Sequence, residues 1–181
     1  MVRWLPGATI AAALGLAGAA SAQTPKPAVG EQPAASAEAP SPAFDRLKAL
    51  AGEWEGTAAA HGQRLPTRAT VKVVSAGSAV MLVTDPGTAH EMVTMFHRDD
   101  GALMATHYCS AMNQPRMKAT SAADPSRIAF QFVDGTNLGP HPAHMQGLVV
   151  TSDGPDHHLQ EWTFAQGGQL ATMTFDMRRT R

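Results

Sequence analysis

The sequence predicts an all-β fold, a roughly ten-stranded antiparallel up-and-down barrel with a short N-terminal helix. Short apolar runs typical of strands recur at intervals of roughly 10 to 15 residues, and no long segment keeps a helical period. Turn-forming residues separate these runs, as at Asp85-Pro86-Gly87, Asp99-Asp100-Gly101 and Gly167-Gly168. An open sheet of this size would leave two unpaired edges, and closure into a barrel removes both of them.

The predicted helix lies at the start of the folded region. Phe44, Leu47 and Leu50 have the spacing of one apolar helix face, and Gly52 ends the pattern. We expect one or two amphipathic turns that plug one end of the barrel.

The predicted strands follow this helix in unbroken succession. Each is a short run bounded by turn chemistry, and nearly every connection has the length of a hairpin. The strands are expected at Glu53–Ala60, Pro66–Ser75, Ser78–Thr84, His90–His97, Ala102–Ser110, Arg116–Ala122, Arg127–Val133, Ala143–Ser152, His157–Phe164 and Gln169–Arg178.

The predicted strand Ala102–Ser110 carries the most chemically useful side chains. Strand alternation places His107 and Cys109 on one face. The Asp-Gly pair before this strand predicts a hairpin, and residues 113–116, which include Pro115, predict a second turn after it.

The N-terminal region has the features of export. A charged start, an apolar run and Ala20-Ser21-Ala22 predict a signal peptide over residues 1–22. Residues 23–41 are rich in Pro and Ala with almost no large apolar side chain, which predicts a disordered linker. Residues 42–181 have the usual length of one domain. We expect a periplasmic or secreted protein with no membrane anchor after cleavage.

Composition excludes some partners. Lys and Arg number 14 against 15 for Asp and Glu, with no basic run, so nucleic acid is not an expected partner. Cys109 is the one cysteine, so the chain forms no internal disulfide. A lone thiol on an apolar strand is more often a small buried side chain than a nucleophile.

Four residues are candidates for ligand binding: His107, Asn113, Arg116 and His144. An inward imidazole at His107 can orient a ligand, act as a base or bind a metal, or it can be a hydrogen-bonded lumen residue without chemistry. Asn113 and Arg116 either line the mouth or only shape a turn. A metal site would combine His107 with His141 and His144, but no pair has a diagnostic spacing, so the metal stays unknown. No catalytic residue is assigned.

The run Leu50-Ala51-Gly52-Glu53-Trp54-Glu55-Gly56 opens the first predicted strand. Its Gly-x-Trp part resembles the signature of the calycin superfamily, the lipocalin-like barrels, and Arg178 resembles the basic residue that packs over this Trp. The resemblance implies that Trp54 and Arg178 close the base of the barrel, as a cation stacked on an indole.

Within that superfamily, the expected ten strands look closer to the nitrobindin-like and fatty-acid-binding branches than to eight-stranded lipocalins. The runs Thr106–Cys109 and Asn113–Arg116 also resemble a group of bacterial lipocalin-like domains. Nitrobindin-like members bind haem through a histidine late in the chain. No motif around such a residue matches in this sequence, so the resemblance does not imply that this chain binds haem.

The expected function is binding of a small apolar molecule in the barrel lumen, oriented by His107 with help from Asn113, Arg116 and His144. Two alternatives stay open. One is a haem- or metal-binding barrel that acts on a small oxidant or nitrogen oxide. The other is a structural barrel with no ligand.

Overall fold

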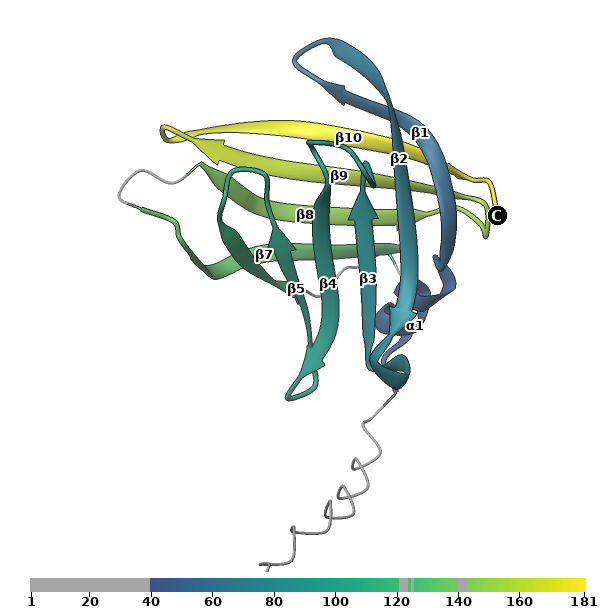
Figure 1. Ribbon diagram of the computed structural model, residues 1–181. Helices are drawn as coiled ribbons and strands as arrows, with labels where there is room; N and C mark the ends of the chain where they lie inside the picture. Colours follow the sequence, from purple (N-terminus) through teal and green to yellow (C-terminus); the bar gives the residue numbers. More distant parts are fainter. Residues whose placement is uncertain (1–39, 121–123, 125, 140–142) are drawn as a thin grey trace, which may run out of the picture. The chain divides into compact units, whose positions relative to one another are not determined.

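The computed structural model describes residues 40–181, apart from 121–123, 125 and 140–142. Ten antiparallel strands form a closed barrel in which each strand pairs with its neighbours in sequence and β1 pairs with β10 (Figure 1). This confirms the predicted all-β barrel. The strands are β1 (Gly52–Ala60), β2 (Gln63–Val74), β3 (Ala79–Thr84), β4 (Met92–Asp99), β5 (Ala102–Tyr108), β6 (Gln114–Thr120), β7 (Arg127–Thr136), β8 (His144–Ser152), β9 (His157–Gln166) and β10 (Gln169–Arg179).

The short helix α1 (Pro42–Ala49) closes one end of this barrel. The Ser41 side chain caps it by accepting a hydrogen bond from the backbone N–H of Phe44, and Pro42 needs no partner at the first helical position. Phe44 and Leu47 are buried, and Leu50 follows them into the core. The predicted amphipathic plug is therefore present.

Paired positive φ angles identify the tight hairpin turns. Asp100 and Gly101 have φ angles of 47° and 79°, which a type I′ turn requires at both central positions. The pairs His61-Gly62 and Gly167-Gly168 also have positive φ angles. The predicted Asp-Gly hairpin is confirmed.

Two prolines lie inside strands rather than at their borders. The predicted turn over residues 113–116 is wrong, because the chain turns over 109–113 and Pro115 already pairs with Gly135 in the β6–β7 ladder. The β5–β6 ladder ends at Thr106 and Arg116, so the missing N–H of Pro115 falls just beyond it. Pro66 likewise lies in β2 beyond Ala69, where the β2–β3 ladder begins.

Trp54 anchors the closed end. Its indole is 1% exposed and donates to the Leu50 carbonyl at 2.8 Å. The guanidinium above it belongs to Arg179, whose Cζ lies 4.3 Å from the ring centroid. The prediction of Arg178 for this place is wrong by one residue: Arg178 is exposed, because strand alternation directs it away from Met177 and Arg179.

The predicted signal peptide (1–22) lies outside the described residues, as does the predicted linker (23–41) up to residue 39. The part of the chain that the structure describes contains no helix long and apolar enough to cross a membrane.

An exposed contact near the closed end depends on pH. Nδ1 of His157 lies 2.5 Å from Asp153 Oδ1 and Nε2 lies 2.8 Å from Asp176 Oδ1. Hydrogen bonds to Asp176 first, and then to Asp153, raise the pKa of His157, with a smaller opposing effect of burial. The imidazolium therefore links the β8–β9 turn to β10.

We expect His157→Gln to lower the free energy of unfolding by about 1 kcal/mol at pH 6, the upper range for an exposed ion pair. Because the raised pKa belongs to the folded state, the contribution is complete below pH 6.5 and disappears as the pH rises through that pKa. Urea unfolding from pH 6 to 9 measures the difference, with exposed His90→Gln as the control. A difference that stays constant over this range would contradict the ion pair.

Candidate functional site

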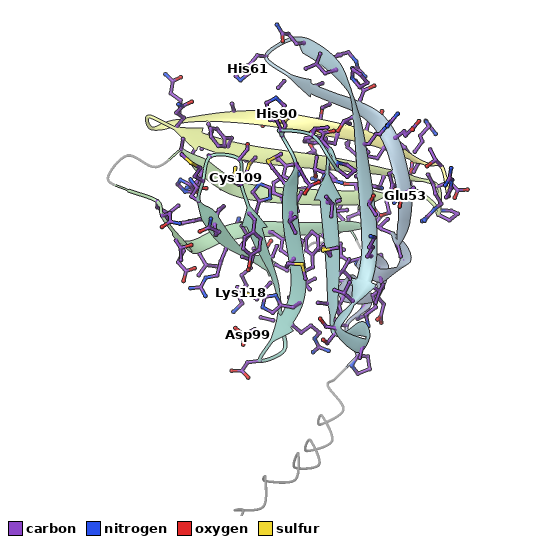
Figure 2. The ribbon with its side chains drawn as sticks, in the orientation of Figure 1. Glu53, His61, His90, Asp99, Cys109 and Lys118 are labelled. Atoms are coloured by element: carbon purple, nitrogen blue, oxygen red, sulfur yellow. The ribbon has the colours of Figure 1, made fainter. Side chains whose placement is uncertain are left out.

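An apolar recess opens at the end of the barrel opposite α1. It has a volume of about 410 Å³, within the range of small-molecule sites. Figure 2 shows His61 and Cys109 towards this end and Asp99 towards the other. We call this recess the open-end cavity. The described residues that line it are Ala60, His61, Met92, Cys109, Ser110, Ala111, Met145, Phe164, Gln166, Gln169, Leu170, Ala171, Thr172 and Met173.

Polarity in the open-end cavity follows depth. Among these lining residues, all the polar ones except Cys109 are exposed, whereas the methionines and Phe164 are buried or half-buried. Met145 on β8 pairs with Phe164 on β9, and Met173 on β10 pairs with Trp162. The wall is therefore apolar and the rim is polar.

The closed end leaves almost no space. A void of about 10 Å³ lies among Leu47, Leu50, Val71, Val80, Leu82, Phe96, Val150 and Gln160. This volume holds at most one water molecule. Among the described residues, the closed end of the lumen therefore has no room for a ligand larger than water.

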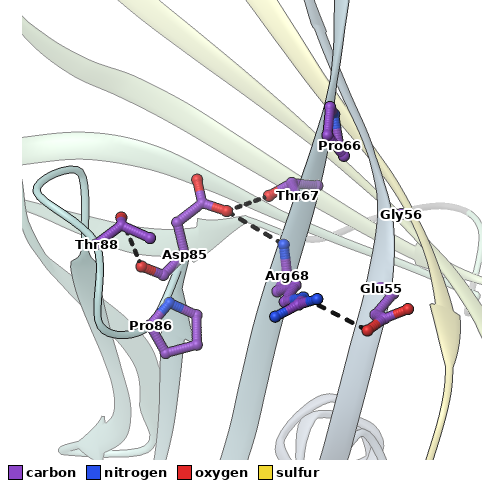
Figure 3. A pocket seen from close by; sticks show the side chains of 8 residues that line it. All are labelled: Glu55, Gly56, Pro66, Thr67, Arg68, Asp85, Pro86 and Thr88. Atoms are coloured by element: carbon purple, nitrogen blue, oxygen red, sulfur yellow. Dashed lines mark hydrogen bonds and ion pairs between the residues drawn. The ribbon is translucent and has the colours of Figure 1, made fainter.

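A further recess, of about 400 Å³, lies between β2 and the β3–β4 turn (Figure 3). Its polar groups are occupied with one another: Arg68 forms an ion pair with Glu55, and Asp85 accepts hydrogen bonds from Thr67 and from the Arg68 backbone. An adjoining recess of about 580 Å³ shares Glu55, Arg68 and Pro86. Because Arg68, Glu55 and Asp85 already have protein partners, these two recesses offer a ligand few free polar groups.

His107 lies inside the barrel on β5, 2% exposed. Its Nδ1 lies 2.9 Å from Thr94 Oγ1, and its ring packs at 4.8 Å from Trp162. Burial lowers the pKa of His107 to about 4, so the imidazole is neutral at pH 7. Nε2 is buried without a hydrogen-bond partner in the described structure. His107 is not a lining residue of the open-end cavity, but Cys109, two residues later, is.

A line of hydrogen bonds continues from Trp162 along the inner face of β9. Trp162 Nε1 donates to Gln160 Oε1, and Gln160 Nε2 lies 3.0 Å from His158 Nε2. His158 is 0% exposed and stacks edge-on against Trp54. Burial is the main cause that lowers the pKa of His158 to about 4. The barrel interior is therefore polar in its middle and uncharged.

Asn113 holds the turn after β5. Its amide donates to the Ala143 carbonyl at 2.7 Å, and its Oδ1 is buried without a partner among the described atoms. The turn that it anchors includes Cys109, Ser110 and Ala111, which line the cavity. Asn113 therefore positions part of the cavity wall.

Arg116 and His144 do not line the open-end cavity. The Arg116 guanidinium forms two hydrogen bonds with the carboxylate of Asp134, and both side chains are exposed. This pair corrects the prediction that Arg116 lines the mouth, because alternation on β6 turns it outward from Pro115 and Met117. His144 is buried with its ring 4.6 Å from Phe132, and its Nε2 lies 2.7 Å from Gln146 Nε2.

The described residues contain no group of three or more His, Cys, Asp or Glu side chains placed to hold a metal ion. His141, the third member of the predicted metal set, lies outside the described residues. A metal bound by His107, His141 and His144 stays a prediction.

Sequence reasoning missed the rim of the cavity. His61, Gln166 and Gln169 lie beside hairpin turns whose positions the sequence indicates, but their convergence depends on closure of β1 against β10. A single sequence shows strands and turns, whereas the shared mouth follows only from the closed barrel.

No protein-family model matches this sequence, and no curated protein matches it. Among solved structures, the crystal structure of Rv2717c from M. tuberculosis is similar, with a TM-score of 0.56 and 17% identity over 78% of this chain and 99% of that one. A redesigned β barrel also aligns, with a TM-score of 0.37 and 15% identity over 75% of this chain and 95% of that one. The likeness to Rv2717c shows the fold, a ten-strand antiparallel β-barrel.

Proposed function

We propose that this protein binds a small, largely apolar molecule in the open-end cavity, as an exported carrier or receptor without catalysis. One observation carries the proposal: a recess of about 410 Å³ whose inner wall is formed by methionines and Phe164. Methionine side chains adapt to the shape of an apolar guest. Their burial against a ligand is favourable by about 25 cal/mol per Å² of apolar area.

His107, which is buried beneath the cavity wall, supports the proposal. A native interior rarely leaves a polar atom unpaired, and such an atom calls for a partner that protein contacts do not supply. His107 Nε2 and Asn113 Oδ1 are both unpaired in the described structure, near the turn that lines the cavity. We propose that these two atoms bind water beneath the cavity wall, or a polar group of a ligand that reaches past this wall.

A haem or metal is the second candidate, favoured by the same Nε2 atom. A neutral imidazole with a free nitrogen is a suitable metal ligand. The cavity wall, however, offers thioethers and a thiol but no buried imidazole among its described residues. A barrel with no ligand, the third candidate, is favoured by the packed closed end, where the void is about 10 Å³.

The test is titration of the full chain with N-phenyl-1-naphthylamine, an uncharged probe whose fluorescence rises in apolar surroundings. We expect saturable binding with a stoichiometry of one. We also expect Ala171→Trp to lower the affinity at least about tenfold. The half-buried Ala171 side chain lies on the cavity wall, and an indole at this position fills the space.

The matched control is Ala89→Trp, in an exposed turn that does not line the cavity. Ala171→Leu is a second, smaller change in case the indole prevents folding, which thermal unfolding would reveal. Absence of saturable binding in the folded wild-type protein would overturn the proposal. Uptake of zinc or haem that His107→Ala abolishes would instead favour the second candidate.

A further inference from the structure

The open-end cavity contains no formal charge among its described lining residues. Its exposed polar side chains are His61, Ser110, Gln166, Gln169 and Thr172, which offer imidazole, hydroxyl and amide groups. No Lys, Arg, Asp or Glu lines this recess in the described part of the chain. The polar rim can therefore form hydrogen bonds but cannot neutralise an ion.

Some charged side chains outside the cavity lining have protein partners. Arg116 is held by Asp134 on the outer face of the barrel. Asp85 accepts hydrogen bonds from Thr67 and the Arg68 backbone, and Glu91 accepts one from the backbone N–H of Gly87. An anionic ligand would therefore find no Lys or Arg among the described residues that line the cavity.

One rim hydroxyl has only a weak partner. Ser110 Oγ donates to the sulfur of Met92 at 3.7 Å, and a thioether is a poor acceptor. A ligand oxygen would accept this hydrogen bond better than the sulfur does. The exposed amides of Gln166 and Gln169 lie on the same rim and both donate and accept.

We propose that the ligand is an uncharged amphiphile, with an apolar body against Met145, Phe164 and Met173 and a hydroxyl- or amide-type head at the Ser110 and Gln169 rim, and that the cavity selects against carboxylates. This inference rests on the proposed binding function and names the ligand class of the same site. Its physical basis is the cost of placing an ionised carboxylate in an apolar recess that has no cation to pair with it.

The experiment compares 1-decanol with decanoate, which share a ten-carbon body and differ in the charge of the head. Each is used to displace N-phenyl-1-naphthylamine from the full chain at pH 8.0, so that imidazole charge does not favour the anion. We expect decanol to displace the probe at a concentration lower by at least about tenfold.

Because decanol also partitions more readily from water, the preference must depend on the cavity and not on the ligands alone. Gln169→Lys places an ammonium on the exposed rim, and we expect it to reduce the decanol preference by at least about fivefold. The matched control is Gln131→Lys on the outer face of β7, which we expect to leave the preference unchanged.

The two failures are distinguishable. If N-phenyl-1-naphthylamine does not bind, the proposed function fails and the ligand class with it. If the probe binds but decanoate displaces it as well as decanol does, only the ligand class is overturned. An unchanged preference in Gln169→Lys would also overturn it, because the head would then lie away from this rim.

Discussion

Lowering the pH from 7 to 4 is expected to remove about 3 kcal/mol from the free energy of unfolding for each of two buried histidines, His107 and His158. Burial lowers the pKa of both groups to about 4, whereas a histidine in the unfolded chain titrates near 6.5. Below pH 6.5 the unfolded chain therefore binds protons that the folded barrel does not. Stability falls over the window from pH 6.5 to 4, the opposite direction to His157.

Urea unfolding of the full chain at pH 7, 6, 5 and 4 measures this effect. His107→Asn keeps a polar atom near Thr94, and His158→Gln keeps one near Gln160, so each removes a titrating ring while it retains part of the hydrogen bonding. We expect each substitution to destabilise the barrel at pH 7 but to flatten the dependence on pH by about half.

The control for both variants is His90→Asn, an exposed histidine in the β3–β4 turn, which should leave the pH dependence as it is in the wild type. The combined loss of about 6 kcal/mol is comparable to the whole stability of a small domain. The barrel should therefore unfold above pH 4. A wild-type protein equally stable at pH 7 and pH 4 would contradict the neutral, buried state of these rings.

Local pattern was sufficient to predict the fold. Alternating apolar runs and turn pairs such as Asp100-Gly101 predicted all ten strands, with borders within about three residues. The borders expected near Pro66 and Pro115 are wrong by three and two residues, because the structure extends both strands past these prolines. Proline removes one donor, and it is tolerated where the adjoining ladder has already ended.

The candidate site was less predictable, because it depends on which face each side chain takes. His107 and Cys109 were placed on one face, and the structure has His107 inside and Cys109 on the cavity wall. Arg116 was expected to line the mouth or to shape a turn, and the structure places it outside, beside Asp134. Alternation between the buried Pro115 and Met117 directs Arg116 outward, but no feature of the sequence established which face of this strand is inner.

The depth of the lumen also could not be predicted from the sequence. Met residues on strands serve equally as core filling or as cavity wall, and the structure uses them both ways. Met117 and Met177 are fully buried, whereas Met92, Met145 and Met173 line the open-end cavity. The difference arises because α1 closes one end of the barrel and nothing comparable in the described chain closes the other.

Replacing Arg179 is expected to have a large effect on stability for a residue near the chain end. Its guanidinium donates to the carbonyls of Ala49, Ala51 and Pro155 and stacks on Trp54. It therefore joins the α1–β1 connection to the β8–β9 turn, which is about one hundred residues later in the sequence. Hydrogen bonds from a charged donor contribute about 1.5 to 3 kcal/mol each, and partial exposure reduces this.

We expect Arg179→Ala to lower the free energy of unfolding by about 3 kcal/mol, because the carbonyls lose their donor and the cation over the Trp54 indole disappears. Arg179→Lys should recover less than half of this loss, since one ammonium cannot reach carbonyls on both sides as a planar guanidinium does. Urea unfolding of the full chain at pH 7 measures both variants.

Arg178→Ala is the matched control, because the neighbouring arginine is exposed on the outer face and has no contact with Trp54 among the described interactions. Surface substitutions of this kind change stability by at most about 0.5 kcal/mol. A larger destabilisation by Arg178→Ala than by Arg179→Ala would contradict this arrangement. It would mean that Arg178, the residue that the calycin resemblance indicated, points inward and packs over Trp54. Equal small effects would instead mean that α1 closes the base without help from a cation.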